Sequence, residues 1–284
     1  MVIDSAELAG LEVLTLVHEN TAAALMYAID TKNLPSQVPK TMLIINQGHN
    51  NFETSIVRFN KTKDPKKDKE ILTVEILEDD GIEFTGGLDM NTQIVRILGE
   101  KFDNQEERKG KPSLFSNMKS IRRLFKEADN QKEILSANKE MNIKIPEILD
   151  QVDLITKLTR DEFDAKIQPI IQNIDTVLDR VLKSDYIKEV TDIELLGGGL
   201  WVPLVKRHLE TWLKEIGKDL PLGSHLNSDE AMAFGAGYMG ANYSSTYKVP
   251  KVYMYQHVPE TIYLNVSETG CKGEDCFSKS MTLF

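Results

Sequence analysis

Residues 42–57, MLIINQGHNNFETSIV, decide how this chain folds. An apolar run at 43–45 leads into a small polar turn at 46–51, and a second run at 52–57 alternates apolar and polar residues. Two such runs on either side of a polar, glycine-bearing turn predict a strand, a turn and a second strand at the edge of a buried sheet. A turn in that place can direct backbone N–H groups towards an anion, so the same stretch is a candidate phosphate loop.

Composition places the chain among globular proteins of one or two domains. Its 284 residues are 41% hydrophobic and 27% charged, and the net charge is −10. A negative charge of this size argues against sequence-independent binding to nucleic acid or to an anionic membrane. No uncharged apolar stretch approaches the roughly 18–20 residues of a membrane span, and no basic segment leads into an apolar one at the N-terminus. We therefore expect no membrane span and no signal peptide.

The two cysteines, Cys271 and Cys276, lie in a CKGEDC segment near the C-terminus. Two thiols with no histidine pair at ligand spacing do not make a zinc site. Free thiols are the favoured interpretation, and a local disulfide is the alternative. The five histidines form no triad or metal cluster that the sequence reveals, so we expect no metal site and no catalytic constellation of that kind.

Hydrophobic periodicity predicts that strands and helices interleave along the chain. Besides the hairpin, strands are expected at 11–17, 71–77, 193–196, 252–258 and 261–266, with one or two short strands between 141 and 154. Helices are expected at 21–30 with Asn20 as N-cap, at 88–102, at 116–137, from a capping box at 159–162 with a kink at Pro169, after 203, and at 229–241 with Asn227 or Ser228 as cap. Glycine-bearing turns at 46–51, 79–87 and 197–199 follow strands, which predicts an α/β fold with phosphate-loop candidates at strand ends.

Each chemical candidate has a plainer alternative. A glycine run at 197–199 would let a phosphate group or a ring approach the backbone closely, because no Cβ intervenes. A tight turn required only for packing is the alternative, and it applies more strongly to the pair at 86–87. Glu19 and Asp229 could orient water or a hydrated metal ion, although single carboxylates at the ends of elements are more often helix caps.

The order of these motifs is more specific than any one of them. The segments are HENTAAALMYAID (18–30), LIINQGHNNFETSI (43–56), FTGGLDMN (84–91), LSAN (135–138), LLGGGLWVPLV (195–205) and LNSDEAMAFGAGYMGA (226–241). In this order they resemble the 70-kDa heat-shock chaperones, which are actin-like ATPases whose two lobes close on ATP. Asn20 in place of the usual proline, GLDM at 87–90, and Ala128 with Lys132 resemble the large ER-resident branch, the 170-kDa glucose-regulated or hypoxia up-regulated proteins.

The resemblance covers about residues 6–266 and implies a domain organisation. Residues 1–246 would be a partial nucleotide-binding domain, the end of the first lobe plus the second lobe, with a helical subdomain at about 88–183. Residues 247–284 would be the linker and the start of the substrate-binding β-domain. Because the match begins inside the family's nucleotide-binding domain, we expect a chain truncated at both ends. The surfaces of 21–28 and 234–239 would then be exposed and prone to association.

The resemblance also implies ATP or ADP with Mg²⁺ as cofactor, and a set of nucleotide-binding positions. These are Gly48, Asn50, Asn51, Gly86, Gly87, Lys132, Ser136, Gly197, Gly198, Gly199, Trp201 and Asp229. The base side keeps the family's adenosine loop, although Glu133 stands where the main family has arginine. Trp201 stands where an arginine stacks on adenine. Its indole could stack on the base itself, a contact worth on the order of 1 kcal/mol, or could merely cover the core.

The phosphate side departs from the family. An acidic residue, three glycines and a threonine are replaced here by Asn46, then Gly48, His49 and Asn50, then Asn51. An amide cannot carry the negative charge that helps to hold Mg²⁺ and its water, and the larger side chains add bulk where backbone amides approach phosphate. The first phosphate loop of the family, and its lysine and threonine for hydrolysis, have no counterpart. We expect no catalytic residue in this chain and negligible hydrolysis.

Three functional hypotheses follow. The chain could be a chaperone nucleotide-binding lobe that acts in protein folding in the ER lumen, with unfolded polypeptide as partner. It could be a non-catalytic module that promotes nucleotide exchange on a partner 70-kDa chaperone, with 88–183 as the contact surface. It could also be a truncated product of a longer chaperone gene. Turnover of MgATP would favour the first, and faster release of ADP from a partner without turnover would favour the second.

Overall fold

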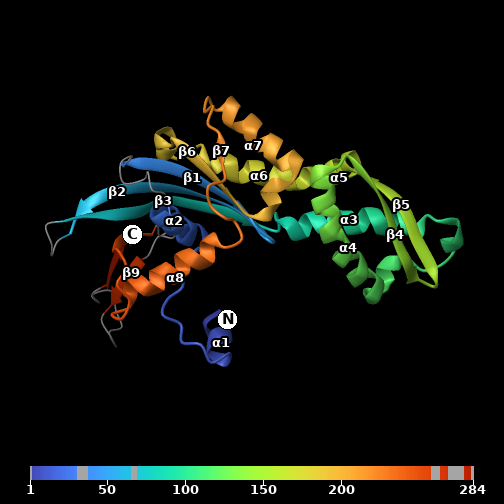
Figure 1. The fold of residues 1–284 in the computed structure, drawn as a ribbon, viewed down its shortest axis with the longest axis horizontal. Coiled ribbons are helices and arrows are strands. Elements are labelled where there is room, and N and C mark those ends of the chain that lie inside the picture. Colours follow the sequence, from blue (N-terminus) through green and yellow to red (C-terminus); the bar gives the residue numbers. More distant parts are fainter. Residues whose placement is uncertain (1, 31–37, 65–68, 257–262, 268–277, 283–284) are drawn as a thin grey trace.

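A computed structural model of the chain describes residues 2–30, 38–64, 69–256, 263–267 and 278–282. A six-stranded mixed sheet with the strand order β7-β6-β1-β2-β3-β8 lies at its centre (Figure 1). The strands are β1 (Lys40–Gln47), β2 (Asn51–Lys63), β3 (Glu70–Glu83), β6 (Asp192–Leu196), β7 (Leu222–Gly223) and β8 (Val252–Tyr255). β1 and β2 pair antiparallel and β1 and β6 pair parallel, so the predicted hairpin and the α/β class are confirmed.

Strand β1 is buried along its whole length. Leu43 and Ile45 pack into the core on one face of the sheet, while Met42 and Ile44 pack into the core on the other face. A strand covered on both faces has no polar face to present to water, so its sequence is a continuous apolar run and does not alternate. The run at 43–45 is therefore central to the sheet, with the turn 48–50 at its end.

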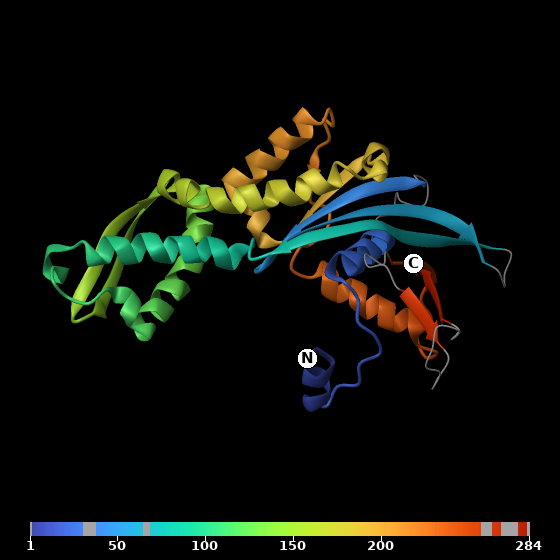
Figure 2. The same ribbon diagram turned by 180° about the vertical axis from the view of Figure 1, so that it is seen from behind.

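Helices cover both faces of the sheet (Figures 1 and 2). On one face lie α2 (Glu19–Asp30) and α8 (Ala231–Tyr243), and on the other lie α6 (Gln168–Val181) and α7 (Pro203–Glu215). A Cβ on Gly235 of α8 would lie 1.9 Å from the carbonyl oxygen of Ala22 in α2. The three alanines of α2 and the glycine of α8 therefore allow these two helices to approach closely.

This packing corrects one expectation about exposed surface. Residues 21–28 were expected to face solvent, but all of them except Met26 are buried against the sheet and α8. Met239 is buried as well, whereas Phe234 is 58% exposed, as expected. The apolar surface offered for association is therefore much smaller than the sequence suggested, because α8 covers α2 within the same chain.

A second group of elements extends beyond one end of the sheet (Figures 1 and 2). It consists of α3 (Gly87–Asp103), α4 (Met118–Ala137), α5 (Arg160–Lys166) and the hairpin of β4 (Glu140–Leu149) with β5 (Val152–Thr159). Short helical turns η2 (Glu106–Arg108) and η3 (Leu114–Ser116) connect α3 to α4, and η4 (Asp185–Glu189) leads back to the sheet. The core of this group is continuous with the core on the α6 and α7 face of the sheet.

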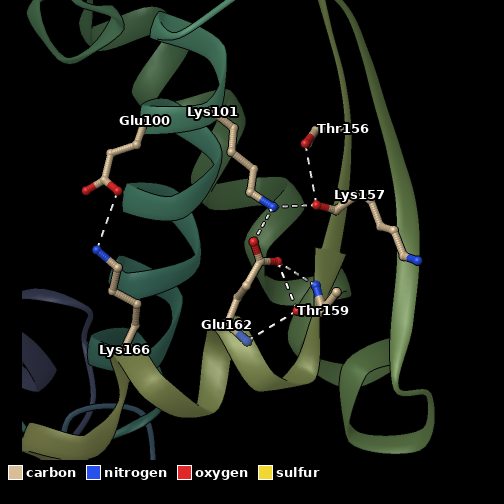
Figure 3. Close-up of polar contacts among 7 residues, drawn as sticks. All are labelled: Glu100, Lys101, Thr156, Lys157, Thr159, Glu162 and Lys166. Carbon is tan, nitrogen blue, oxygen red and sulfur yellow. Dashed lines mark hydrogen bonds and ion pairs between the residues drawn. The ribbon is translucent and has the colours of Figure 1, made fainter.

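The capping box predicted at 159–162 is present and anchors α5 to its neighbours (Figure 3). The Thr159 hydroxyl accepts a hydrogen bond from the Glu162 N–H at 3.2 Å, and Glu162 Oε2 accepts one from the Thr159 N–H at 2.9 Å. Lys101 of α3 lies 2.7 Å from Glu162 Oε1 and donates to the carbonyl oxygen of Lys157. The cap therefore joins α3, β5 and α5 at one point.

Several predicted elements begin or end elsewhere. Residues 11–17 are not a strand: the short helix α1 (Val2–Leu8) ends before them, and they have no regular structure. The three leucines of this segment are exposed, so they are not packed into the core of the sheet. Asn20 is not an N-cap, since α2 begins at Glu19. Its buried amide donates to Ser55 Oγ at 2.9 Å instead. The turn expected at 79–87 is shorter, because β3 continues to Glu83 and pairs with β2 throughout.

The C-terminal half gives further corrections. Helix α8 begins at Ala231, so neither Asn227 nor Ser228 caps a helix starting at 229, although the Asn227 side chain accepts a hydrogen bond from the Asp229 N–H at 3.1 Å. The predicted kink at Pro169 is a break between α5 and α6. Strand β8 ends at Tyr255, and β9 (Tyr263–Ser267) pairs with β10 (Ser278–Thr282). Residues 257–262 and both cysteines lie outside the described residues.

No helix within the described ranges is both long enough and apolar enough to span a lipid bilayer.

Glu53 of β2 is a carboxyl group whose surroundings oppose its charge. It is partly buried beside the turn 46–51, where Asn51 Nδ2 donates to Glu53 Oε1 at 3.2 Å. Burial raises the pKa of Glu53, the Asn51 hydrogen bond opposes that rise, and the nearby carboxylates of Glu19 and Asp79 add to it. The folded chain therefore holds the Glu53 proton more tightly than the unfolded chain does.

We predict that Thr159→Ala lowers the free energy of unfolding by about 1 kcal/mol, because it removes the N-cap oxygen of α5. Urea titration followed by circular dichroism measures the change. Thr156→Ala is the matched control, since the Thr156 hydroxyl contacts only the carbonyl of Lys157 at 3.4 Å and caps no helix. Equal loss in the two variants would contradict a stabilising role for the cap.

We predict that Glu53→Gln raises stability at pH 7 and that the gain disappears in acid. A raised folded pKa means that the contribution of Glu53 to stability is complete below its ordinary value of 4.5 and is lost as pH rises through the folded pKa. Thermal midpoints measured between pH 4 and pH 8 test this. Glu12→Gln, at an exposed position, should change the midpoint little at any pH. A Glu53→Gln gain that does not depend on pH would contradict the electrostatic explanation.

Candidate functional site

A cavity of ≈ 620 Å³ opens at the end of β1, between the sheet, α4 and the segment before α8. Its lining residues are Glu19, Asn46, Gly48, His49, Gly87, Lys132, Glu133, Ser136, Gly197, Gly198, Gly199, Trp201, Val202, Ser228, Asp229 and Met232. The fold thus brings together residues that lie as far apart in sequence as the start of α2 and the start of α8. Every site residue predicted from the sequence lines this cavity except Asn50, Asn51 and Gly86.

These three residues hold the turn in place beside the cavity. The carbonyl oxygen of Asn50 accepts a hydrogen bond from the Thr85 N–H at 3.0 Å, and the Asn51 side chain is bonded to Glu53. A Cβ on Gly86 would lie 2.3 Å from the carbonyl oxygen of His49. Glycine is therefore required at position 86 because the turn packs closely against the start of α3. At this position the packing explanation holds and not the ligand-binding one.

The glycine run after β6 has both packing and open positions. Gly197 has a φ of +89°, and its Cβ would lie 2.3 Å from the carbonyl oxygen of Gln47. A Cβ on Gly199 would lie 2.7 Å from Cγ of the same glutamine. Gly198, in contrast, is exposed and has open space where a Cβ would point. Packing of η5 (Gly198–Trp201) on β1 thus explains two of the glycines, and the third leaves room beside the cavity.

Asn46, at the end of β1, connects the cavity to α2. Its side chain is 3% exposed, and its Nδ2 donates to Glu19 Oε2 at 3.1 Å. Its Oδ1 is buried and has no hydrogen-bond partner among the described residues. The amide of Asn46 carries no charge, so it cannot neutralise Glu19, but its hydrogen bond holds the Glu19 carboxylate beside the central strand.

Lys132 and Ser136 lie on the same side of α4, facing the cavity. The Lys132 ammonium donates to the carbonyl oxygen of Gly87 at 3.3 Å and lies 3.5 Å from Asp129 Oδ1. The Ser136 hydroxyl donates to the carbonyl oxygen of Lys132 at 2.9 Å. The ammonium group therefore already has two partners in the protein, whereas the oxygen of Ser136 still has acceptor capacity.

Trp201 is 50% exposed at the cavity, with the Lys206 ammonium 6.0 Å from the centroid of its ring. The partly buried Met232 and the buried Val202 also line the cavity. A side chain that only covered the core would be buried, so the core alternative accounts for only half of this indole. The half-exposed ring offers a face on which a flat aromatic group can stack.

The charges of the lining are mostly negative. Carboxylates come from Glu19, Glu133 and Asp229, and an ammonium group comes from Lys132. Within the ranges that the structure describes, no group of three or more histidine, cysteine, aspartate or glutamate side chains is placed to hold a metal ion. The cavity therefore offers a surface for an uncharged aromatic group with hydrogen-bonding edges, and its three carboxylates against one ammonium group oppose a polyphosphate that enters without a metal ion.

Sequence reasoning missed Val202, Ser228 and Met232 as cavity-lining residues. Ser228 is adjacent to Asp229, and Met232 follows it by three residues at the start of α8, so helical spacing could have found the methionine. Nothing in the sequence could have found Val202, because it is a buried core residue, 2% exposed, that borders the cavity only through the turn of η5.

Comparison with known proteins agrees with this architecture. The sequence model of the family described as Hsp70 protein matches residues 1–279. Hypoxia up-regulated protein 1 of Danio rerio is 30% identical over 253 residues, which cover 87% of this chain and 25% of the relative. The protein of the same name from Xenopus laevis is 31% identical over 255 residues, covering 87% of this chain and 38% of the relative. Heat shock protein hsp88 of Neurospora crassa is 30% identical over 252 residues, covering 87% and 33%.

The chain thus spans between 25% and 38% of the length of these three curated relatives. The resemblance to the heat-shock chaperones and to the hypoxia up-regulated proteins is confirmed. The mixed sheet covered by helices on both faces also fits the actin-like ATPase fold of that family. Since the family model covers nearly the whole chain, this protein belongs to the Hsp70 family.

Proposed function

We propose that this chain is a chaperone module of the Hsp70 family that binds an adenine nucleotide through its base and ribose and does not hydrolyse it. The single observation that carries the proposal is the pairing of Asn46 with Glu19 at the end of β1. By the family resemblance, its place of action is protein folding in the ER lumen, with unfolded polypeptide and a partner 70-kDa chaperone as its partners.

Phosphoryl transfer depends on positive charge placed where negative charge develops, supplied by Mg²⁺ and by lysine or arginine. Bound MgATP would bring its own metal ion and a transferable phosphoryl group. The end of β1 offers an amide in place of the carboxylate that would help to hold the hydrated ion. The ammonium of Lys132 already has Gly87 and Asp129 as partners, so part of its charge and hydrogen-bonding capacity is used within the protein.

The base end of the cavity is better suited to binding. Trp201 and Met232 provide aromatic and apolar surface, Gly198 leaves space beside the backbone, and Ser136 offers a hydroxyl. An adenine ring on Trp201 and a ribose near Ser136 would use groups that the chain has, with no demand on positive charge. This division between the two ends of the cavity supports binding without turnover.

The family resemblance also suggests how the chain corresponds to a whole chaperone. We assign the sheet and its helices to the second lobe of the nucleotide-binding domain, preceded by the end of the first lobe. We assign about 88–183 to the helical subdomain and 247–284 to the linker and the start of the substrate-binding β-domain. The extension of α3, α4 and the β4–β5 hairpin beyond the sheet supports the subdomain assignment.

Nucleotide exchange on a partner chaperone is the second candidate function. The observation that favours it is the same extension beyond the sheet, which exposes the outer face of the β4–β5 hairpin, including Ile155 at 63%. A surface that acts by shape needs no hydrolysis in the module itself, so this candidate is compatible with the pairing of Asn46 and Glu19.

We predict that the 284-residue chain does not turn over MgATP. Release of radiolabelled phosphate should stay at the level of the buffer, while a complete 70-kDa chaperone in parallel shows turnover. The same preparation is then mixed with that chaperone carrying fluorescent ADP. Faster ADP release would support the exchange function. An unchanged rate of release would count against exchange, and nucleotide binding would be the remaining proposed function. Phosphate release by the chain itself would overturn the proposal.

We predict that Asn46→Asp destabilises the chain by about 1–2 kcal/mol at pH 7, because it replaces a hydrogen bond with two carboxylates facing each other. Millimolar Mg²⁺ should restore part of the loss in this variant and leave the wild type unchanged, as thermal melts would show. The double variant Asn46→Asp with Glu19→Gln is the control, since it removes the repulsion. A single variant as stable as the wild type would contradict the importance of this pair.

A further inference from the structure

We infer that the cavity prefers an uncharged purine nucleoside to its phosphorylated forms, so that affinity falls as phosphate groups are added. The inference rests on the proposed function, because it takes the same cavity and the same base end. It goes further in naming the ligand class, and it reverses the order of affinity that a nucleotide-hydrolysing site would show.

The first support is that the backbone donors of Gly48 and of the start of α3, which could otherwise face a phosphate, are already occupied. The N–H of Gly48 donates to the carbonyl oxygen of Asn51 at 3.2 Å, inside the turn. At the start of α3, the N–H of Gly87 donates to the carbonyl oxygen of Gly48 at 2.9 Å, and that of Leu88 to the carbonyl oxygen of His49 at 2.8 Å. The end of a helix that could attract an anion is therefore closed by the turn itself.

The Gly86 N–H is occupied in the same way. It donates to Asp89 Oδ2 at 3.0 Å, which places a carboxylate in the first turn of α3. The helix dipole is thus satisfied by a negative charge from the protein's own chain. A phosphate approaching this helix would meet a carboxylate, and it would have to displace the contacts between α3 and the turn.

The second support is the charge of the lining. Glu19, Glu133 and Asp229 line one cavity of ≈ 620 Å³, and each phosphate group would bring further negative charge among them. Lys132 cannot compensate fully, because its ammonium is shared between Gly87 and Asp129. Like charges held within several ångströms at low effective dielectric repel appreciably. We expect roughly a tenfold loss of affinity for each phosphate group added.

The third support is that the remaining contacts suit a neutral ligand. The indole of Trp201 is half exposed, and Met232 adds an apolar side chain to the cavity lining. Stacking on an aromatic ring and burial of apolar surface do not depend on a charged group in the ligand. The binding energy therefore comes from the base, and the phosphate tail only reduces it.

Isothermal titration calorimetry of the 284-residue chain with adenosine, AMP, ADP and ATP, each with and without Mg²⁺, tests the inference. At a fixed, low ionic strength we expect the affinity order adenosine, AMP, ADP, ATP without Mg²⁺, and a smaller loss for ADP and ATP with Mg²⁺, because the ion neutralises part of their charge. Added salt should narrow the differences, since screening weakens the repulsion. Tighter binding of MgATP than of adenosine would overturn this inference and leave the proposed function standing. A folded chain that binds none of the four ligands would overturn both.

Two variants separate charge from stacking. Glu133→Arg should raise the affinity for AMP and ATP roughly tenfold relative to the affinity for adenosine, because it removes a negative charge from the lining and adds a positive one. Glu127→Arg, on the same helix but outside the cavity lining, is the matched control and should change neither. Trp201→Leu should weaken all four ligands by a similar factor. An equal gain for adenosine in Glu133→Arg would contradict the electrostatic explanation.

Discussion

Strand β1 is the constraint on which the rest of the molecule depends. Each of its residues is buried, and it pairs with β2 on one side and with β6 on the other. Its alternate side chains enter two separate cores, so helices must cover both faces of the sheet. Because β1 cannot move without disturbing both cores, the residues at its end, Asn46 and Gln47, are held in fixed positions beside the cavity.

Most of the fold could be predicted from the sequence, because the burial of β1 and the ends of several helices produce local sequence patterns. A continuous apolar run, a capping box at 159–162 and helical periodicity each encode an element within a few residues. The failures occurred where distant partners decide. The apolar segment 11–17 has no regular structure and its leucines are exposed, and Asn20 resembles a cap but donates to Ser55 of β2. The burial of the first and the partner of the second depend on distant parts of the chain, which the neighbouring sequence does not reveal.

The cavity was predictable for a different reason. Its residues come from several segments, and only their order along the chain, matched to a family, indicated that they meet. The sequence could not distinguish a glycine that leaves room for a ligand from a glycine that is needed because another part of the chain packs against it. Gly86 and Gly197 prove to be of the second kind and Gly198 is open to the cavity. The distinction depends on whether neighbouring atoms lie too close to the glycine Cα for a Cβ to fit, and only the three-dimensional packing shows this.

The same packing explains why departures from the family at the end of β1 need not disturb the fold. The turn 48–50 and the start of α3 satisfy each other's hydrogen bonds, and Asn46 satisfies Glu19. In a site that binds phosphate, such N–H donors have no partner in the protein until the ligand binds. The ligand-free site is less stable because these donors are unpaired. Here the protein's own groups take those positions. On the proposed function, the chain keeps the architecture of its family while these contacts close the start of α3 to phosphate, and the half-exposed surface of Trp201 is the part that recognises a ligand.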